Sequence, residues 1–107
     1  MSGYIGINLT LTTNNVAYNL LTLIRAVTGY INSPGACRER TIFFPDVSGA
    51  AHVYIGGSDL SSTNYGVLLD EGMGDTVRST KNNIPLLETY VLTDTDDSVI
   101  SVQIHYE

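Results

Sequence analysis

Several residue types on which common protein functions depend are scarce in this sequence. It has no tryptophan, a single cysteine and only five basic residues, which stand against eleven acidic residues for a net charge of -6. Such an acidic chain is unsuited to general nucleic-acid binding, because phosphate contacts need a basic surface. No apolar run approaches the length of a membrane span, and the N-terminus lacks the charged region that opens a signal peptide. We therefore expect no nucleic-acid partner, no membrane and no secretion signal.

The single cysteine, Cys37, excludes an intramolecular disulfide and a zinc site built from cysteines. Arg38 and Arg40 could lower the pKa of its thiol. No histidine or acid lies at a motif spacing from it, so we expect no catalytic role. The two arginines and the Glu39 between them form the one local basic cluster. We expect this cluster to lie on a solvated strand edge or to form salt bridges between subunits.

Charged residues make up only 15% of the chain, whereas hydrophobic residues make up 43%. The hydrophobic content excludes a disordered tail, and 107 residues suffice for one domain, 1–107, but not for two. A small monomer usually has a more highly charged surface, so the low charge favours a surface that other subunits cover. We therefore expect a homo-oligomer.

Two hydrophobic periods follow one another near the N-terminus. Apolar residues alternate with small or polar ones over residues 4–12, which predicts a strand with one buried face. Over residues 15–28 they recur at helical spacing, with an N-cap expected at 13–15 and a C-terminal cap at Gly29. A helix here would lie across the open end of a β-barrel. The alternative is a strand, since residues 20–27 are also rich in β-formers.

The rest of the chain alternates short apolar runs with turn residues. The expected strands are 40–44, 51–55, 65–69, 75–79, 87–92 and 100–106. The spacing of the first two predicts an antiparallel hairpin, and removal of the last strand should unfold the domain. About seven or eight short antiparallel strands and one short helix predict a mainly β protein, either a β-sandwich or a jelly-roll-like barrel.

The stretch 53–73, VYIGGSDLSSTNYGVLLDEGM, reads as a strand, a loop and a second strand. Its steps V-Y-I-G-G-S-D, S-S-T-N-Y-G and V-L-L-D-E-G resemble a recurring element of small bacteriophage structural proteins. In that element a V-Y-(I/V)-G strand precedes a Ser/Thr/Asn loop, a glycine and a (P/V)-L-x-x-G step. The resemblance covers about a fifth of the chain. Tyr65 before Gly66, and Asp70-Glu71 in place of small residues, depart from the pattern.

The resemblance implies a phage virion structural protein, most directly a capsid-decorating or cement protein that stabilises the head by protein–protein contacts. Such a protein would have no enzymatic activity and no cofactor. It would bind the major capsid protein, or another virion protein, in a virion assembled in the host cytoplasm. A trimer at a lattice axis is one natural arrangement of its copies. The residues expected at its contact surface are Ser2, Gly3, Tyr4, Ile5, Gly56, Gly57, Ser58, Asp59, Asn64, Tyr65 and Gly66.

A second function fits the same loop. A tail- or fibre-associated module that binds carbohydrate would stack sugar rings on tyrosine, and Tyr65 would be its first contact. The chain has seven tyrosines, but their scatter and the lack of tryptophan favour packing and interface anchoring.

Local motifs for metal or phosphate binding are incomplete. The acidic turn 94–97 lacks the glycine and the distal glutamate of an EF-hand loop, so its aspartates need no metal. Asp70 and Glu71 are adjacent in a strand and should point to opposite faces. The segment 56–58 is not followed by the lysine and helix of a phosphate loop. We therefore expect no metal site.

The two histidines, His52 and His105, both lie on expected strands. Two histidines without a third positioned ligand make a poor zinc or catalytic site, so outward-facing strand histidines are the simpler interpretation. A hydrolytic enzyme would require one of them to lie beside carboxylates in a pocket. We therefore expect no catalytic residues.

Overall fold

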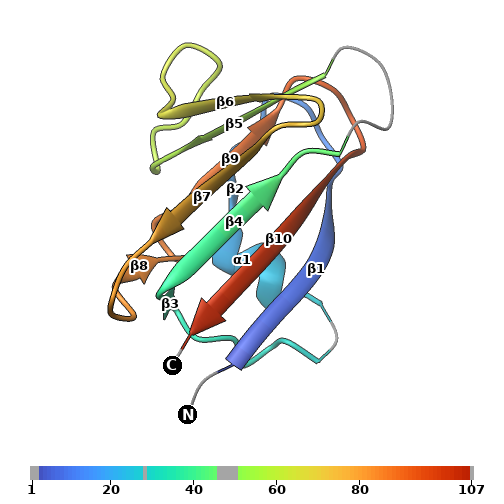
Figure 1. The fold of residues 1–107 in the computed structure, drawn as a ribbon. Helices are drawn as coiled ribbons and strands as arrows, with labels where there is room; N and C mark the ends of the chain where they lie inside the picture. The colour runs from blue at the N-terminus through green and yellow to red at the C-terminus, as the bar shows by residue number, and fades with distance from the viewer. Residues whose placement is uncertain (1–2, 28, 46–50, 107) are drawn as a thin grey trace.

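The alternation near the N-terminus produces the first strand, β1 (Gly3–Leu11), which pairs along its whole length with the last described strand, β10 (Ser98–Tyr106). The antiparallel register runs from Gly3 opposite Tyr106 to Leu11 opposite Ser98. The computed structural model describes residues 3–27, 29–45 and 51–106. The first and last strands therefore lie side by side, and both ends of the chain leave from the same end of the molecule (Figure 1).

Ten strands and one helix form the described part of the chain. They are β1 (Gly3–Leu11), β2 (Tyr18–Asn19), α1 (Leu20–Arg25), β3 (Ala36–Cys37), β4 (Glu39–Phe43), β5 (His52–Gly56), β6 (Val67–Asp70), β7 (Gly74–Arg78), β8 (Ile84–Pro85), β9 (Tyr90–Thr93) and β10 (Ser98–Tyr106). The first sheet has the order β1-β10-β4-β7 and the second the order β2-β9-β5-β6, while β3 pairs with β8. Every pairing is antiparallel. The expected mainly β fold with one short helix is confirmed. The three two-residue strands account for the higher strand number.

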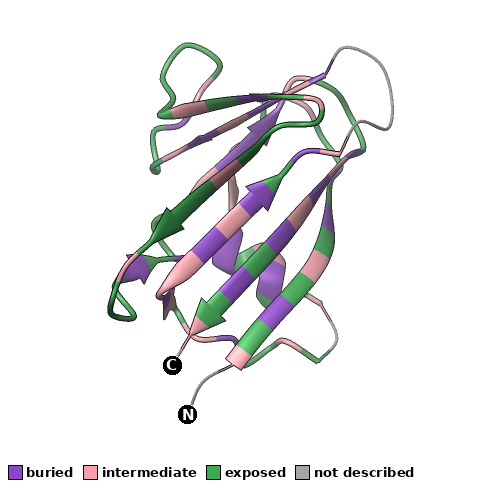
Figure 2. Ribbon diagram, viewed as in Figure 1, coloured by how far each residue is buried: buried purple, intermediate pink, exposed green. Residues whose placement is uncertain are grey.

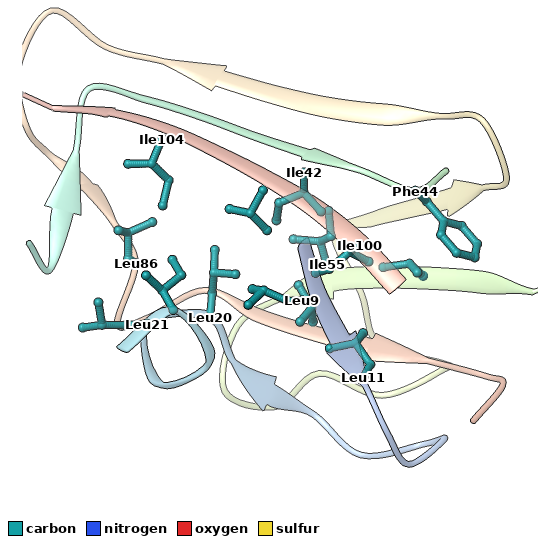
Figure 3. Packing of buried hydrophobic residues seen from close by; sticks show 14 of the residues in the cluster. Leu9, Leu11, Leu20, Leu21, Ile42, Phe44, Ile55, Leu86, Ile100 and Ile104 are labelled. Carbon is teal, nitrogen blue, oxygen red and sulfur yellow. The ribbon is translucent and has the colours of Figure 1, made fainter. Parts of the chain in front are cut away.

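One hydrophobic core fills the space between the sheets. Buried and exposed residues alternate along β1 and β10 in Figure 2, as the period of two requires. Figure 3 shows Ile42 and Ile100 of the first sheet beside Ile55 of the second, and Ile104 farther along the core beside Leu86. Each such side chain contributes roughly 1.5 to 3 kcal/mol when it is fully buried. The core thus depends on both sheets at once.

The helix is shorter than its apolar stripe predicts. Asn15 has a φ of 58°, which a right-handed helix cannot contain, and Tyr18 and Asn19 pair with β9 as a short strand. Helix α1 therefore begins only at Leu20, and the Asn19 side chain caps it by accepting the Thr22 N–H at 3.0 Å. The expected caps at 13–15 and at Gly29 are wrong, because the helix ends at Arg25 with Ala26 as its C-cap.

The helix belongs to the core rather than to the end of a barrel. Its buried residues Leu20, Leu21 and Ile24 join the core cluster, and α1 lies behind the first sheet in Figure 1. No helix among residues 3–27, 29–45 and 51–106 is long and apolar enough to cross a membrane.

The expected hairpin between residues 40–44 and 51–55 is wrong. Strand β4 lies in the first sheet between β10 and β7, whereas β5 lies in the second sheet between β9 and β6. Both strands bury alternate residues against the core, Ile42 from one side and Val53 from the other. The chain therefore changes layer between them, through a connection that includes 46–50, which lie outside the described residues.

Candidate functional site

The outer face of the second sheet carries an apolar row that crosses three strands. In β5, Val53 and Ile55 face the core, so Tyr54 between them faces outward. The register places Leu92 of β9 and Leu68 of β6 directly opposite Tyr54. Leu92 is buried without belonging to the core cluster, whereas Leu68 is 36% exposed. Side chains that lie directly opposite one another on neighbouring strands pack together.

A further aromatic ring extends this row. Tyr65 lies at the end of the loop before β6. The centre of its ring lies 5.0 Å from the centre of the Tyr54 ring, at an interplanar angle of 54°. Tyr65 remains 44% exposed. We call Tyr54, Tyr65, Leu68 and Leu92 the tyrosine face. It is a partly exposed apolar surface with a polar hydroxyl on each ring, which is the composition that protein interfaces favour.

The loop from β5 to β6 is held in place by its own contacts. Leu60 is buried beneath Gly56, where a Cβ atom would lie 3.1 Å from the Leu60 Cδ1. The Asn64 side chain donates to Asp59 Oδ2 at 2.9 Å, and the Gly66 N–H donates to the Ile55 carbonyl at 2.9 Å. The loop therefore presents Tyr65 in a defined position beside Tyr54.

The expected contact residues fall into two separate groups. Residues 56–59 and 64–66 lie at the tyrosine face, at the end of the molecule opposite the termini (Figure 1). Gly3, Tyr4 and Ile5 begin β1 in the other sheet, and Ser2 lies outside the described residues. The structure thus does not bring the two groups together into one surface.

The N-terminal group borders a hollow of about 690 Å³. Tyr4 and Ile5 line it from β1, and Tyr30 and Ile31 line it from the loop after α1. Tyr4 is 56% exposed and packs edge-on against His105 with the ring centres 5.2 Å apart. This hollow is open and mixed in polarity. It offers space beside the first residues of β1 rather than a set of converging functional groups.

A histidine held between two carboxylates lies at the margin of the tyrosine face. His52 Nδ1 lies 2.7 Å from Asp94 Oδ2, and His52 Nε2 lies 3.2 Å from Asp70 Oδ1. The His52 backbone N–H also donates to Asp94 Oδ1 at 2.8 Å. The hydrogen bond that the His52 ring donates to Asp94 raises the pKa of His52 above 6.5, with added attraction from the nearby acids. Burial tends to raise the pKa of Asp94, but its bonds to His52 outweigh this and lower it.

This cluster bears on the hydrolase hypothesis. Carboxylates do lie beside His52, but both ring nitrogens are engaged by them, which leaves neither nitrogen to activate a nucleophile. His105 lies in the other sheet, beside Tyr4, so the two histidines are not brought together. The geometry of His52 with its two carboxylates suits a link between β5, β6 and β9 better than general base catalysis.

The remaining residues with acidic or thiol side chains make contacts within the fold or are buried. No group of three or more His, Cys, Asp or Glu side chains within the described ranges could hold a metal ion. In the acidic turn, Asp96 Oδ1 accepts from the backbone and the side chain of Asn14 at 2.8 and 2.7 Å. Cys37 is fully buried, and this burial raises the pKa of its thiol despite the opposing charge of Arg40. The expected lowering of that pKa is therefore wrong.

The basic cluster is not wholly solvated. Arg40 has the same parity as Ile42 in β4, so its side chain points inward and is 7% exposed. Its Nη2 pairs with Asp75 Oδ2 at 3.1 Å, within one chain. Glu39 faces outward and pairs with Arg78 at 2.6 Å. The expected solvated strand edge is therefore wrong, because β4 lies between β10 and β7 and is paired on both sides.

Sequence reasoning missed most of the tyrosine face. Tyr54 and Leu68 lie 14 residues apart and meet Leu92 only through the pairing of β5 with β6 and β9. The available signal was residue spacing. His52, Tyr54 and Gly56 are two residues apart along one strand, so they lie on the same face of it. The chain matches no protein-family model, and it matches no curated protein. The likeness to phage structural proteins therefore depends on residues 53–73 alone.

Proposed function

We infer that this protein is a non-enzymatic structural protein that acts through protein–protein contact, and that it is a capsid-decorating or cement protein of a bacteriophage virion. The observation that carries the contact role is the tyrosine face, on which Tyr65 and Leu68 are 44% and 36% exposed on a fixed sheet. The resemblance of residues 53–73 supports the assignment to a phage, with the major capsid protein as partner.

The mechanism would be passive. Each copy would bury Tyr54, Tyr65 and Leu68 against the capsid surface, and the apolar area removed from water would contribute about 25 cal/mol per Å². Because such a contact exists only in the assembled shell, it would shift the equilibrium toward the assembled state. The ordered loop from Gly57 to Gly66 would lower the entropy lost on binding, since its contacts already hold it.

The direct test combines copy number with a surface mutation. Quantitative mass spectrometry of purified source particles should find hundreds of copies, in fixed ratio to the major capsid protein. A handful of copies would move the protein to the tail or portal, and its complete absence would refute a virion role.

The surface mutation tests the contact face itself. Tyr65→Ala should reduce binding of the purified protein to capsids that lack it. Phe43→Ala is the matched control, because Phe43 is an aromatic residue with 39% exposure on the first sheet. Equal loss of binding in both variants would contradict a specific role for the tyrosine face.

Carbohydrate binding in a tail or fibre is the second candidate. The specific observation in its favour is the tilted pair of Tyr54 and Tyr65. A hollow of about 590 Å³, which Asp59, Glu88 and Tyr90 help to line, lies farther along β5 and β9, where Tyr90 pairs with Gly56. Aromatic faces with nearby carboxylates can stack on and hydrogen-bond to sugars. A glycan contact that disappears in Tyr65→Ala would favour this function, whereas a glycan screen without any binder would count against it.

A further inference from the structure

Strand β1 leaves one long edge of the first sheet open. It spans nine residues, Gly3–Leu11, and has β10 on one side only. Apart from the β10 ladder, no hydrogen bond joins the backbone of Gly3–Leu11 to any other described residue. The stretch contains neither a charged residue nor a proline. Exposed edges of this kind are templates for pairing with another strand.

The other edges of the two four-stranded sheets are protected. Strand β7 carries Asp75 and Arg78, and β6 has four residues that end in Asp70. These two strands are consecutive in the chain and are joined by a turn in which the Met73 N–H donates to the Asp70 carbonyl at 3.0 Å. Strand β2 has two residues. Charge, shortness and a tight connection are the usual ways to prevent edge pairing, and β1 uses none of them.

The distribution of charge singles out the same strand. The first charged residue in the chain is Arg25, although the whole molecule has a net charge of -6. Two copies of an acidic protein repel one another unless they meet through an uncharged surface. The edge of β1 is such a surface, and it is the same on each copy, as a two-fold contact requires.

We propose that β1 pairs with β1 of a second copy, antiparallel and about a two-fold axis, so that the two first sheets form one continuous sheet. This proposal goes beyond the proposed function and does not rest on it. An axis at Ile7 sets Gly3 opposite Leu11 of the second copy, and Ile5 opposite Leu9. The register joins all nine residues and keeps every apolar side chain on the core side. Roughly eight to ten hydrogen bonds would form, because each bonded residue pair exchanges two.

The burial of β1 supports this position of the axis. Ile5, Leu9 and Leu11 on its inner face are buried, whereas Ile7 at its centre is only partly buried. In the proposed pair, Ile7 of each copy lies next to Ile7 of the other and covers it.

The mass of the full-length protein in solution tests the proposal. Sedimentation or light scattering across a concentration series should show 11.6 kDa chains associating to twice that mass, about 23 kDa. Asn8→Lys adds a charge on the exposed face of β1 near the axis and should weaken dimerisation at least about tenfold, through like-charge repulsion. Gln103→Lys is the matched control. It adds the same charge to the same face of the same sheet, on β10, whose two sides are already paired, and should dimerise normally.

Hydrogen exchange on the wild-type protein provides a test that does not depend on the folding of a variant. The amides of β1 that do not bond to β10 should exchange slowly at concentrations where the dimer forms and rapidly on dilution. The amides of β10 should stay protected throughout. A mass that remains at 11.6 kDa at millimolar concentration, or that corresponds to a trimer, would overturn the proposal. So would a dimer in which β1 exchanges rapidly or which Asn8→Lys leaves as tight as Gln103→Lys does.

Discussion

The buried pair of Arg40 and Asp75 gives the sharpest stability prediction. The Arg40 side chain is 7% exposed, and its one hydrogen bond among the described residues joins Nη2 to Asp75 at 3.1 Å. Its Nε and Nη1 are buried without a partner there. Burial lowers the pKa of Arg40, although the charge of Asp75 opposes that shift. The guanidinium has thus lost its water while recovering only part of the lost interaction energy.

Two substitutions should therefore act in opposite ways. Asp75→Ala leaves a buried charge without a partner and should cost about 3 kcal/mol, at the low end of the usual range because Asp75 is itself 23% exposed. Arg40→Met removes the charge and the unpaired donors while keeping a similar volume. It should change the free energy of unfolding by between zero and about 2 kcal/mol in favour of the folded state. Asp75 can then be hydrated.

Urea unfolding followed by far-UV circular dichroism measures both effects, since the midpoint and the slope give the free energy of unfolding. Glu39→Ala is the control. It breaks the outward pair with Arg78 on the same two strands and should cost less than about 1 kcal/mol. If Arg40→Met destabilised the protein as much as Asp75→Ala does, Arg40 would have stabilising partners and the reasoning would be refuted.

Three further predictions concern other parts of the fold. Because the folded state raises the pKa of His52, its protonated form stabilises the protein; that contribution is complete below pH 6.5 and is lost as the pH rises through the raised value. The stability difference between wild type and His52→Gln should shrink over that pH range, and a constant difference would contradict the assignment. Ile100→Ala, at a fully buried position, should cost about 2 to 5 kcal/mol in urea unfolding, and a cost below 1 kcal/mol would show that the site collapses. Gly72→Ala should cost about 1 to 2 kcal/mol by the same assay, because Gly72 has a φ of 84° while a Cβ there meets no atom within 4 Å; no loss would mean that the turn relaxes.

The alternation of apolar and polar residues predicts correctly those strands that bury every second side chain. The pattern over residues 4–12 and 100–106 corresponds closely to β1 and β10, because each buries every second residue against the core. The same kind of pattern cannot say which layer a strand joins. Residues 40–44 and 51–55 both look like core strands, but β10, β7 and β9 among their partners lie far along the chain, and only the pairing of β5 with β6 joins consecutive strands.

The helix shows a different limit. Apolar spacing suggested a helix from 15 to 28, but the pairing of Tyr18 and Asn19 with β9 and the left-handed backbone of Asn15 prevent a start before Leu20. These constraints are tertiary and override local propensity.

The candidate site was predictable only where it is local. The loop that ends in Tyr65 follows from its glycines and hydroxyl residues, whereas the contact of His52 with Asp94 joins residues 42 positions apart. The burial of Arg40 also had a sequence signal, because Arg40 lies two residues before Ile42 and therefore on the same face of the strand. The charged residues beside Arg40 obscured this signal.

The pairing of β1 with β10 also fixes the order in which a nascent chain can fold. The first sheet needs β10 beside β1, yet β10 is the last of the described strands to leave the ribosome. At roughly 5 to 20 residues per second, β1 waits on the order of ten seconds with both of its edges free. An uncharged strand in that state is open to pairing with other nascent chains. We expect a chain that stops at Asp97 to aggregate during synthesis, and an early chaperone to be needed more for residues 3–11 than for any later strand.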